Sequence, residues 1–88
     1  MAESLLKRKV YVGVNADFSS DGVLMPRSIS LEDGKTYQIE HITHVQPVES
    51  TQDNVECNRY TCRINGKNAY VFVEKNGNQH RWYVMTKA

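Results

Sequence analysis

The stretch at residues 59–85, RYTCRINGKNAYVFVEKNGNQHRWYVM, contains three runs of alternating apolar and polar residues separated by Asn65-Gly66 and Asn76-Gly77. Alternation with a period of two is typical of a half-buried β-strand. Asn-Gly between such runs is the strongest short signal for a β-hairpin, because a type I′ turn needs positive φ at both of its central residues. The stretch therefore predicts three antiparallel strands joined by two tight turns.

Two-residue turns also predict which residues are neighbours across the strands. The predicted core face carries the rows Tyr60–Val71–Trp82 and Cys62–Ala69–Val84, with Ile64 and Val73 beside them. The opposite face carries the rows Arg59–Phe72–Arg81 and Thr61–Tyr70–Tyr83, with Arg63 and Met85 beside them. This assignment depends on parity, since odd and even positions after Asn58 must lie on separate faces of the sheet.

Alternation also predicts two strands nearer the amino terminus. In residues 10–18 the even positions through Phe18 form the apolar side, and Gly13 lets the strand bend. In residues 23–31 the apolar side comprises Val23, Met25, Ile29 and Leu31. Pro26 interrupts this second strand, and because proline cannot donate to a ladder, it marks a sheet edge or a bulge.

The turn at Glu32-Asp33-Gly34-Lys35 follows, and its register can be inferred from the flanking residues. A two-residue loop would place apolar residues opposite polar ones. A three-residue loop with a glycine bulge instead pairs Leu31 with Tyr37 and Ile29 with Ile39, so we expect that loop.

We expect the third strand over residues 36–45, ended by Pro47, and the longest loop over residues 49–56. A six-stranded antiparallel meander of this size hides its edges by closing. The predicted fold is therefore all-β: a small SH3-like or OB-like barrel over residues 9–88, after a flexible segment at residues 1–8. An open sheet covered by the amino-terminal segment is the alternative.

Composition limits the class of protein. With 88 residues the chain can form one core. Its 11 basic and 10 acidic residues give a net charge of +1, which excludes a strongly basic tail for nucleic acid. No apolar run reaches the roughly 20 residues that span a bilayer, so no membrane contact is expected. No secretory signal is expected either, since Leu5-Leu6 precedes the basic residues at 7–9.

Two cysteines, Cys57 and Cys62, are too few for the disulfide framework of small secreted domains, which favours a cytoplasmic protein with free thiols. Their odd spacing places them on opposite faces of one strand. His41 and His44 are three apart and would also point to opposite faces, while His80 should face the core beside Val73. We therefore expect no metal site, no cofactor and no catalytic cluster; the sequence does not predict an enzyme.

Several short motifs spread over nearly the whole chain support a resemblance. They are Val10-Tyr11-Val12, Ala16-Asp17-Phe18, Asp21-Gly22, Pro26-Arg27-Ser28-Ile29, Glu32-Asp33-Gly34-Lys35, Arg59-Tyr60-Thr61 and Arg81-Trp82-Tyr83-Val84. Together they resemble a short, uncharacterised protein family of Gram-positive bacteria. The chain departs from the family pattern at Leu31 and Glu40-His41. The resemblance implies a bacterial cytoplasmic domain and transfers no functional site.

One predicted surface favours binding. It comprises Arg59, Arg63, Tyr70, Phe72, Arg81 and Tyr83. Arginine and tyrosine are enriched in protein interfaces, so contact with a protein partner, or with a second copy of the chain, is the leading hypothesis. A weak single-stranded nucleic-acid binder is the rival, because bases stack on aromatic rings beside guanidinium groups. A third interpretation is purely structural, since cross-strand rows of this kind also stabilise a sheet.

Overall fold

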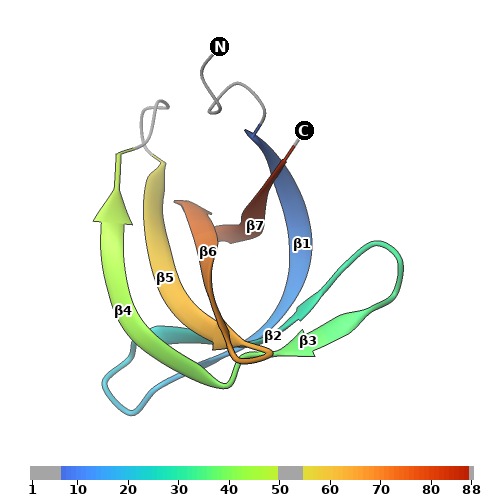
Figure 1. Cartoon of the computed structure of the whole chain (residues 1–88). Helices are drawn as coiled ribbons and strands as arrows, with labels where there is room; N and C mark the ends of the chain where they lie inside the picture. The colour runs from blue at the N-terminus through green and yellow to red at the C-terminus, as the bar shows by residue number, and fades with distance from the viewer. Residues whose placement is uncertain (1–6, 50–54, 88) are drawn as a thin grey trace.

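The computed structural model describes residues 7–49 and 55–87. They form seven antiparallel strands: β1 Lys7–Phe18, β2 Leu24–Ser30, β3 Thr36–Gln38, β4 His41–Val48, β5 Glu56–Ile64, β6 Lys67–Asn76 and β7 Gln79–Lys87. The strands form one sheet in the order β3-β2-β1-β7-β6-β5-β4, which curls into a half-barrel (Figure 1). The all-β prediction is confirmed, with seven strands in place of six.

The additional strand arises because the predicted third strand bends. β3 pairs with β2, whereas β4 pairs with β5 at the other edge of the sheet. At the corner between them, the Ile39 amide donates to the Arg27 carbonyl (2.9 Å) and the Glu40 amide donates to the Arg63 carbonyl (2.8 Å). The corner therefore connects the two edges of the curled sheet. Pro47 lies inside β4 and does not end it, because an edge strand tolerates a missing donor.

The first Asn-Gly hairpin has the predicted register. Tyr60 pairs with Val71 and Cys62 pairs with Ala69. Asn65 and Gly66 have φ values of 53° and 74°, so both central residues of the turn lie in the left-handed region, as a type I′ turn requires.

The second hairpin differs from the prediction by two residues. The turn is formed by Gly77 and Asn78, since Asn76 pairs with Gln79. Of these residues only Gly77 has a positive φ (62°), as in a type II′ turn, which needs glycine only at its first central position. Val73, not Val71, therefore pairs with Trp82. A shift of two residues leaves every side chain on its predicted face.

The core confirms the predicted parity. Its buried residues are Ile29, Tyr60, Cys62, Val71, Val73 and Trp82. The rings of Tyr60 and Trp82 pack with their centroids 5.5 Å apart. Arg81, beside Trp82 in the sequence, is exposed. Even positions of β5 and β7 and odd positions of β6 thus form the core face.

β1 supports both halves of the sheet. Residues 7–12 pair with β7, and residues 13–18 pair with β2, so the change of partner occurs at Gly13. The predicted irregularity at Pro26 is confirmed as a bulge, because Ala16 pairs with Pro26 while Asn15 pairs with Ser28. Phe18 was predicted on the apolar side of this strand, but it is 68% exposed at the strand end.

The loop at residues 32–34 has the predicted length and glycine bulge. The Gly34 amide donates to the Leu31 carbonyl (3.0 Å), the Leu31 amide donates to the Lys35 carbonyl (2.9 Å), and Gly34 has a φ of 87°. The predicted register is wrong, because Ile29 pairs with Tyr37 and not with Ile39. Ile39 instead occupies the corner before β4.

Two further predictions concern segments only partly described. Residues 1–6 of the predicted flexible segment lie outside the described residues, and β1 begins at Lys7, two residues before the predicted domain boundary. Residues 50–54 of the predicted loop also lie outside them, and β5 begins at Glu56. Within the described ranges, no helix has the length and apolarity needed to cross a bilayer.

Candidate functional site

The predicted arginine and aromatic side chains lie on one face of the sheet, opposite the core. A single row crosses four strands on this aromatic face: Arg59 (β5), Phe72 (β6), Tyr83 (β7) and Tyr11 (β1), each directly paired with the next. The predicted rows are corrected accordingly: Tyr83, not Arg81, lies opposite Phe72. Tyr11 was missed as a member because the pairing of β1 with β7 is not visible in the local sequence pattern.

Tyr83 is buried within this face, with 7% of its surface exposed. Its ring stacks on Phe72, with centroids 4.8 Å apart and planes 5° apart, and meets the Tyr11 ring edge-on at 5.9 Å. Its hydroxyl lies 3.5 Å from the Cys57 Sγ. Burial, with the Cys57 contact, raises the pKa of Tyr83. Tyr83 therefore packs beneath the other side chains of this face and is almost completely shielded from solvent.

One half of the aromatic face is internally paired. Glu74 accepts hydrogen bonds from the Lys9 Nζ and from the Tyr11 hydroxyl, both at 2.8 Å. The Lys9 Nζ also lies 4.5 Å from the centre of the Tyr83 ring, and the Arg81 guanidinium lies 3.8 Å from that of Tyr11. Lys9 joins this network through the β1–β7 pairing, and Glu74 joins it through the shifted register of β6 with β7, so neither could be assigned to it from local sequence alone.

Electrostatics hold this network together. Burial raises the pKa of Glu74, but the hydrogen bonds from Lys9 and Tyr11 and the nearby positive charges outweigh burial and lower it. The hydrogen bond to Glu74 raises the pKa of Lys9. Both groups are therefore charged near neutral pH, and Arg81 lies opposite Glu74 across the strands.

The other half of the face is open. Tyr70 is 52% exposed, and the Arg59 guanidinium lies over its ring at 4.5 Å. The Nε of Arg59 is buried and has no hydrogen-bond partner among the described residues. Arg63 is exposed on the same side of β5, where it donates to the Gly66 carbonyl (3.3 Å) at the hairpin turn.

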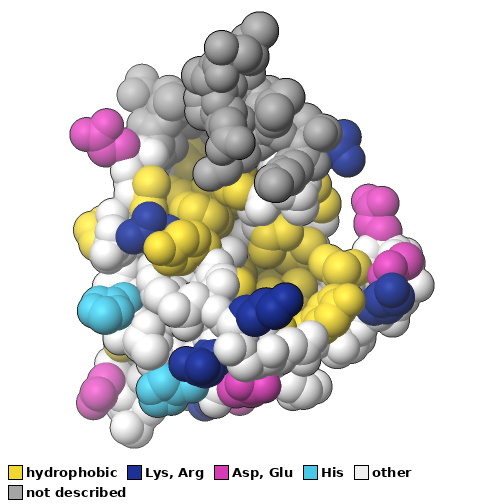
Figure 2. Space-filling model, viewed as in Figure 1, with side chains coloured by type: hydrophobic (Ala, Val, Ile, Leu, Met, Phe, Trp, Pro, Cys, Tyr) yellow, Lys and Arg dark blue, Asp and Glu magenta, His cyan; other side chains and the backbone are white. Residues whose placement is uncertain are grey.

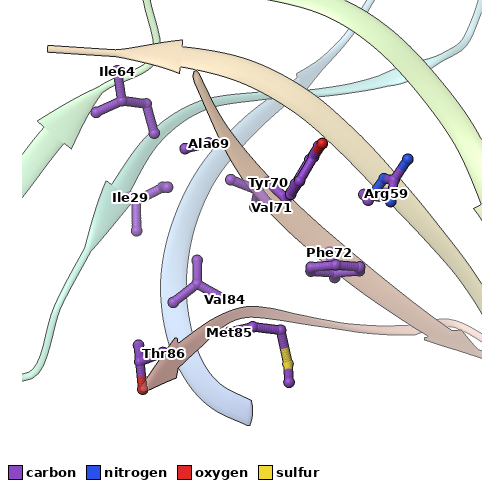
Figure 3. A pocket seen from close by; sticks show the side chains of 10 residues that line it. All are labelled: Ile29, Arg59, Ile64, Ala69, Tyr70, Val71, Phe72, Val84, Met85 and Thr86. Atoms are coloured by element: carbon purple, nitrogen blue, oxygen red, sulfur yellow. The ribbon is translucent and has the colours of Figure 1, made fainter. Parts of the chain in front are cut away.

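A cleft of about 580 Å³ adjoins this open half, between β6 and β7 (Figure 3). It is lined by Ile29, Arg59, Ile64, Ala69, Tyr70, Val71, Phe72, Val84, Met85 and Thr86. Figure 2 shows apolar side chains gathered in a hollow of the viewed face, with Lys and Arg side chains nearby. A largely apolar cleft with a cationic group at its side has the composition of a binding site.

The histidines and cysteines do not converge. A bulge at Thr43 places His41 and His44 on the same side of β4, opposite Arg63 and Thr61, which corrects the predicted opposite orientation. His80 pairs with Lys75 and is exposed, so its predicted place in the core is wrong. Within the described ranges, no three His, Cys, Asp or Glu side chains are grouped as a metal site requires.

The cysteines lie on opposite faces of β5, as predicted. Cys57 faces the hydroxyl of Tyr83 on the aromatic face, while Cys62 belongs to the core. Both are buried and free. Burial raises the pKa of the Cys62 thiol to about 11, so this thiol is un-ionised at neutral pH and a poor nucleophile.

Comparison of the chain with protein-family models, with curated proteins and with solved structures finds no match. The resemblance to a family of Gram-positive bacteria stays a prediction from the sequence.

Proposed function

We propose that the chain is a non-catalytic binding module that contacts a protein partner through Arg59 and Tyr70. The observation that carries this proposal is the stacking of the Arg59 guanidinium over the half-exposed Tyr70 ring beside an apolar cleft. Arginine and tyrosine are among the residues that most often dominate the binding energy of protein interfaces. A preformed stacked pair also loses less side-chain entropy on binding than two mobile side chains.

The other residues of the predicted surface have supporting roles. The stacked rings of Phe72 and Tyr83 pack beside the contact surface. Glu74, which also binds Lys9, accepts a hydrogen bond from Tyr11 and so fixes the Tyr11 ring next to them. Arg63 lies near the hairpin turn and Arg81 lies beyond Tyr11, so both flank the contact. Two free, buried cysteines favour a reducing compartment such as the cytoplasm.

The rival is a weak single-stranded nucleic-acid binder. The observation that favours it is a second stacked pair on the same face, Arg81 over Tyr11 at 3.8 Å, which adds another cation to a potential stacking platform. The net charge of +1 argues against it, because affinity for a polyanion depends on an excess of positive charge.

Site-specific photo-crosslinking tests the leading proposal. A photoreactive phenylalanine analogue at position 70 should give discrete protein adducts in host cells, and addition of Arg59→Gln should reduce their yield at least fivefold. The same analogue at Phe18, which is 68% exposed at the end of β1 and does not line the cleft, is the matched control. Identical adducts from both positions, or none from position 70, would refute the proposal.

Titration of a labelled oligothymidylate at 50 and 200 mM salt distinguishes the nucleic-acid-binding rival from the leading proposal of a protein partner. Under the leading proposal no saturable binding is seen at either salt concentration. Under the rival, affinity falls steeply with salt and is reduced by Arg59→Gln and Arg81→Gln. Sedimentation of the purified chain over a range of concentrations shows whether the partner is a second copy.

A further inference from the structure

The ladder between β6 and β7 stops before the strands end. Its last pair is Phe72 with Tyr83. Continued in the same register, it would pair Val71 with Val84, Tyr70 with Met85, and Ala69 with Thr86. These same six residues line the cleft instead. The cleft is therefore the place where two neighbouring strands have separated.

The separation has a cause in the other pairings. Residues 84–86 of β7 stay paired with residues 8–10 of β1, and residues 67–71 of β6 stay paired with β5. As the sheet curls, each segment follows its own neighbour, and the two diverge (Figure 3). Within the part of the chain that the structure describes, each segment is thus paired on one side only.

Unpaired strand edges present a row of main-chain donors and acceptors, which bind another extended chain. We propose that the cleft binds an extended segment of a partner protein, which enters between β6 and β7 as an additional strand. This proposal rests on the proposed function and specifies the partner of the same site. About four residues fit beside residues 68–71, since a strand rises about 3.4 Å per residue.

The walls of the cleft define the side chains that such a segment needs. On the core side lie Ile29, Val71 and Val84, the first two of which are buried. On the aromatic side lie Tyr70, Phe72 and Met85. Side chains of an inserted strand alternate between these two sides. Apolar side chains at every second position would therefore complete the core.

The charges around the cleft indicate that the other positions are acidic. The charged residues among its lining and their direct cross-strand partners are Lys9, Arg8, Arg59 and Lys67, all cationic. Lys9 is already paired with Glu74, whereas the buried Nε of Arg59 has no partner among the described residues. A carboxylate on the aromatic side would meet Arg59, so the partner segment alternates apolar and acidic residues.

Two synthetic octapeptide libraries test the proposal on the full chain. One alternates Val, Ile or Leu with Asp or Glu; the other replaces the acids with Lys or Arg. The acidic library should yield binders and the basic library none. N-methylation of the central amides of a binder preserves the side chains but removes donors, and it should weaken binding at least tenfold.

Amide hydrogen exchange gives the decisive measurement. A bound peptide should slow exchange of amides within residues 68–71 and 84–86, since only an inserted strand pairs with both edges. Arg59→Gln should weaken binding at least fivefold, whereas Arg27→Gln, which removes an exposed guanidinium that does not line the cleft, should leave it unchanged. Unaltered exchange of the uncomplexed variants in the core shows that they are folded.

The outcomes separate this proposal from the one on which it rests. Adducts at position 70 without amide protection in the cleft would overturn the inserted strand and leave the protein contact intact. Binding of oligothymidylate in the cleft, or equal binding of both libraries, would also overturn it. Absence of both peptide binding and adducts would overturn the two proposals together.

Discussion

Glu74 shows how one carboxylate organises half of the aromatic face. It accepts hydrogen bonds from the Lys9 ammonium and the Tyr11 hydroxyl, both at 2.8 Å, and thereby fixes the two side chains that cover Tyr83. The pKa of Lys9 is raised above its ordinary value by the hydrogen bond to Glu74, and the pKa of Glu74 is lowered below its ordinary value by the hydrogen bonds from Lys9 and Tyr11. Their joint contribution to stability is therefore lost at high pH as Lys9 deprotonates and at low pH as Glu74 becomes protonated.

Glu74→Gln should lower the free energy of unfolding by about 1 kcal/mol at pH 7, because two hydrogen bonds lose their charged acceptor. The difference from the unsubstituted chain should shrink at acidic pH, as Glu74 itself becomes protonated. Urea denaturation at several pH values measures this. Asp17→Asn, which breaks a pair with both side chains more than half exposed, serves as the control and should cost less than about 0.5 kcal/mol. A difference independent of pH would contradict the assigned role.

The two buried cysteines should react slowly with thiol reagents in the folded chain. Both thiols are buried, and that of Cys62 has a pKa of about 11. Both should react with Ellman's reagent at pH 8 more than a hundredfold more slowly in buffer than in urea, because burial keeps the reagent from both thiols and the raised pKa also keeps Cys62 from forming the reactive thiolate. Rapid labelling of either thiol in the folded chain would show that the described packing is wrong at that residue.

At the scale of the elements, the two Asn-Gly dipeptides form different turns. Asn65 occupies the first central position of its turn with a φ of 53°, whereas Asn76 is a paired strand residue. The local sequence signal is the same in both. The difference arises in the pairing of β6 with β7, where Val73 and Trp82 become direct neighbours.

Asn65→Ala should therefore lower the free energy of unfolding by about 1 kcal/mol, since alanine disfavours the left-handed region. Asn76→Ala should change it by less than about 0.5 kcal/mol, because its backbone is extended. The midpoints of urea denaturation compare the two variants directly. Equal losses would indicate that Asn76-Gly77, not Gly77-Asn78, forms the second turn.

At the scale of the whole molecule, a few contacts hold the curl. The Tyr60 hydroxyl on β5 donates to the Leu24 carbonyl on β2, which is far from β5 in the strand order. The corner at Ile39 and Glu40 connects the same two strands through their backbones. These contacts bring the ends of the sheet toward each other, while the separation of β6 from β7 opens the cleft.

Tyr60→Phe should lower the free energy of unfolding by about 1 to 2 kcal/mol, because the part-buried Leu24 carbonyl loses its donor. Thermal denaturation followed by circular dichroism measures the loss. Tyr70→Phe is the matched control, since its ring is 52% exposed and its hydroxyl should contribute less than about 0.5 kcal/mol. If both substitutions cost the same, the cross-barrel contact does not stabilise the curl.

The candidate site was predictable only in part. Alternation placed Arg59, Tyr70 and Phe72 on one face, and the structure confirms that placement. It could not show that Tyr83 is covered, because the covering residues Lys9 and Tyr11 come from a strand some 70 positions away in the sequence. The cleft was likewise absent from the prediction, since an interrupted ladder leaves no mark on local alternation.

Within β5, β6 and β7, the sequence by itself determined which side chains share a face. Side-chain direction alternates at every residue of a strand, so a register error of two positions leaves that assignment unchanged. Only the tertiary structure decided the register of β6 with β7, the corner that divides the predicted third strand, and the opening of the cleft. Each of these depends on contacts between strands that the local sequence pattern does not specify. Those contacts form only when the sheet curls around its core.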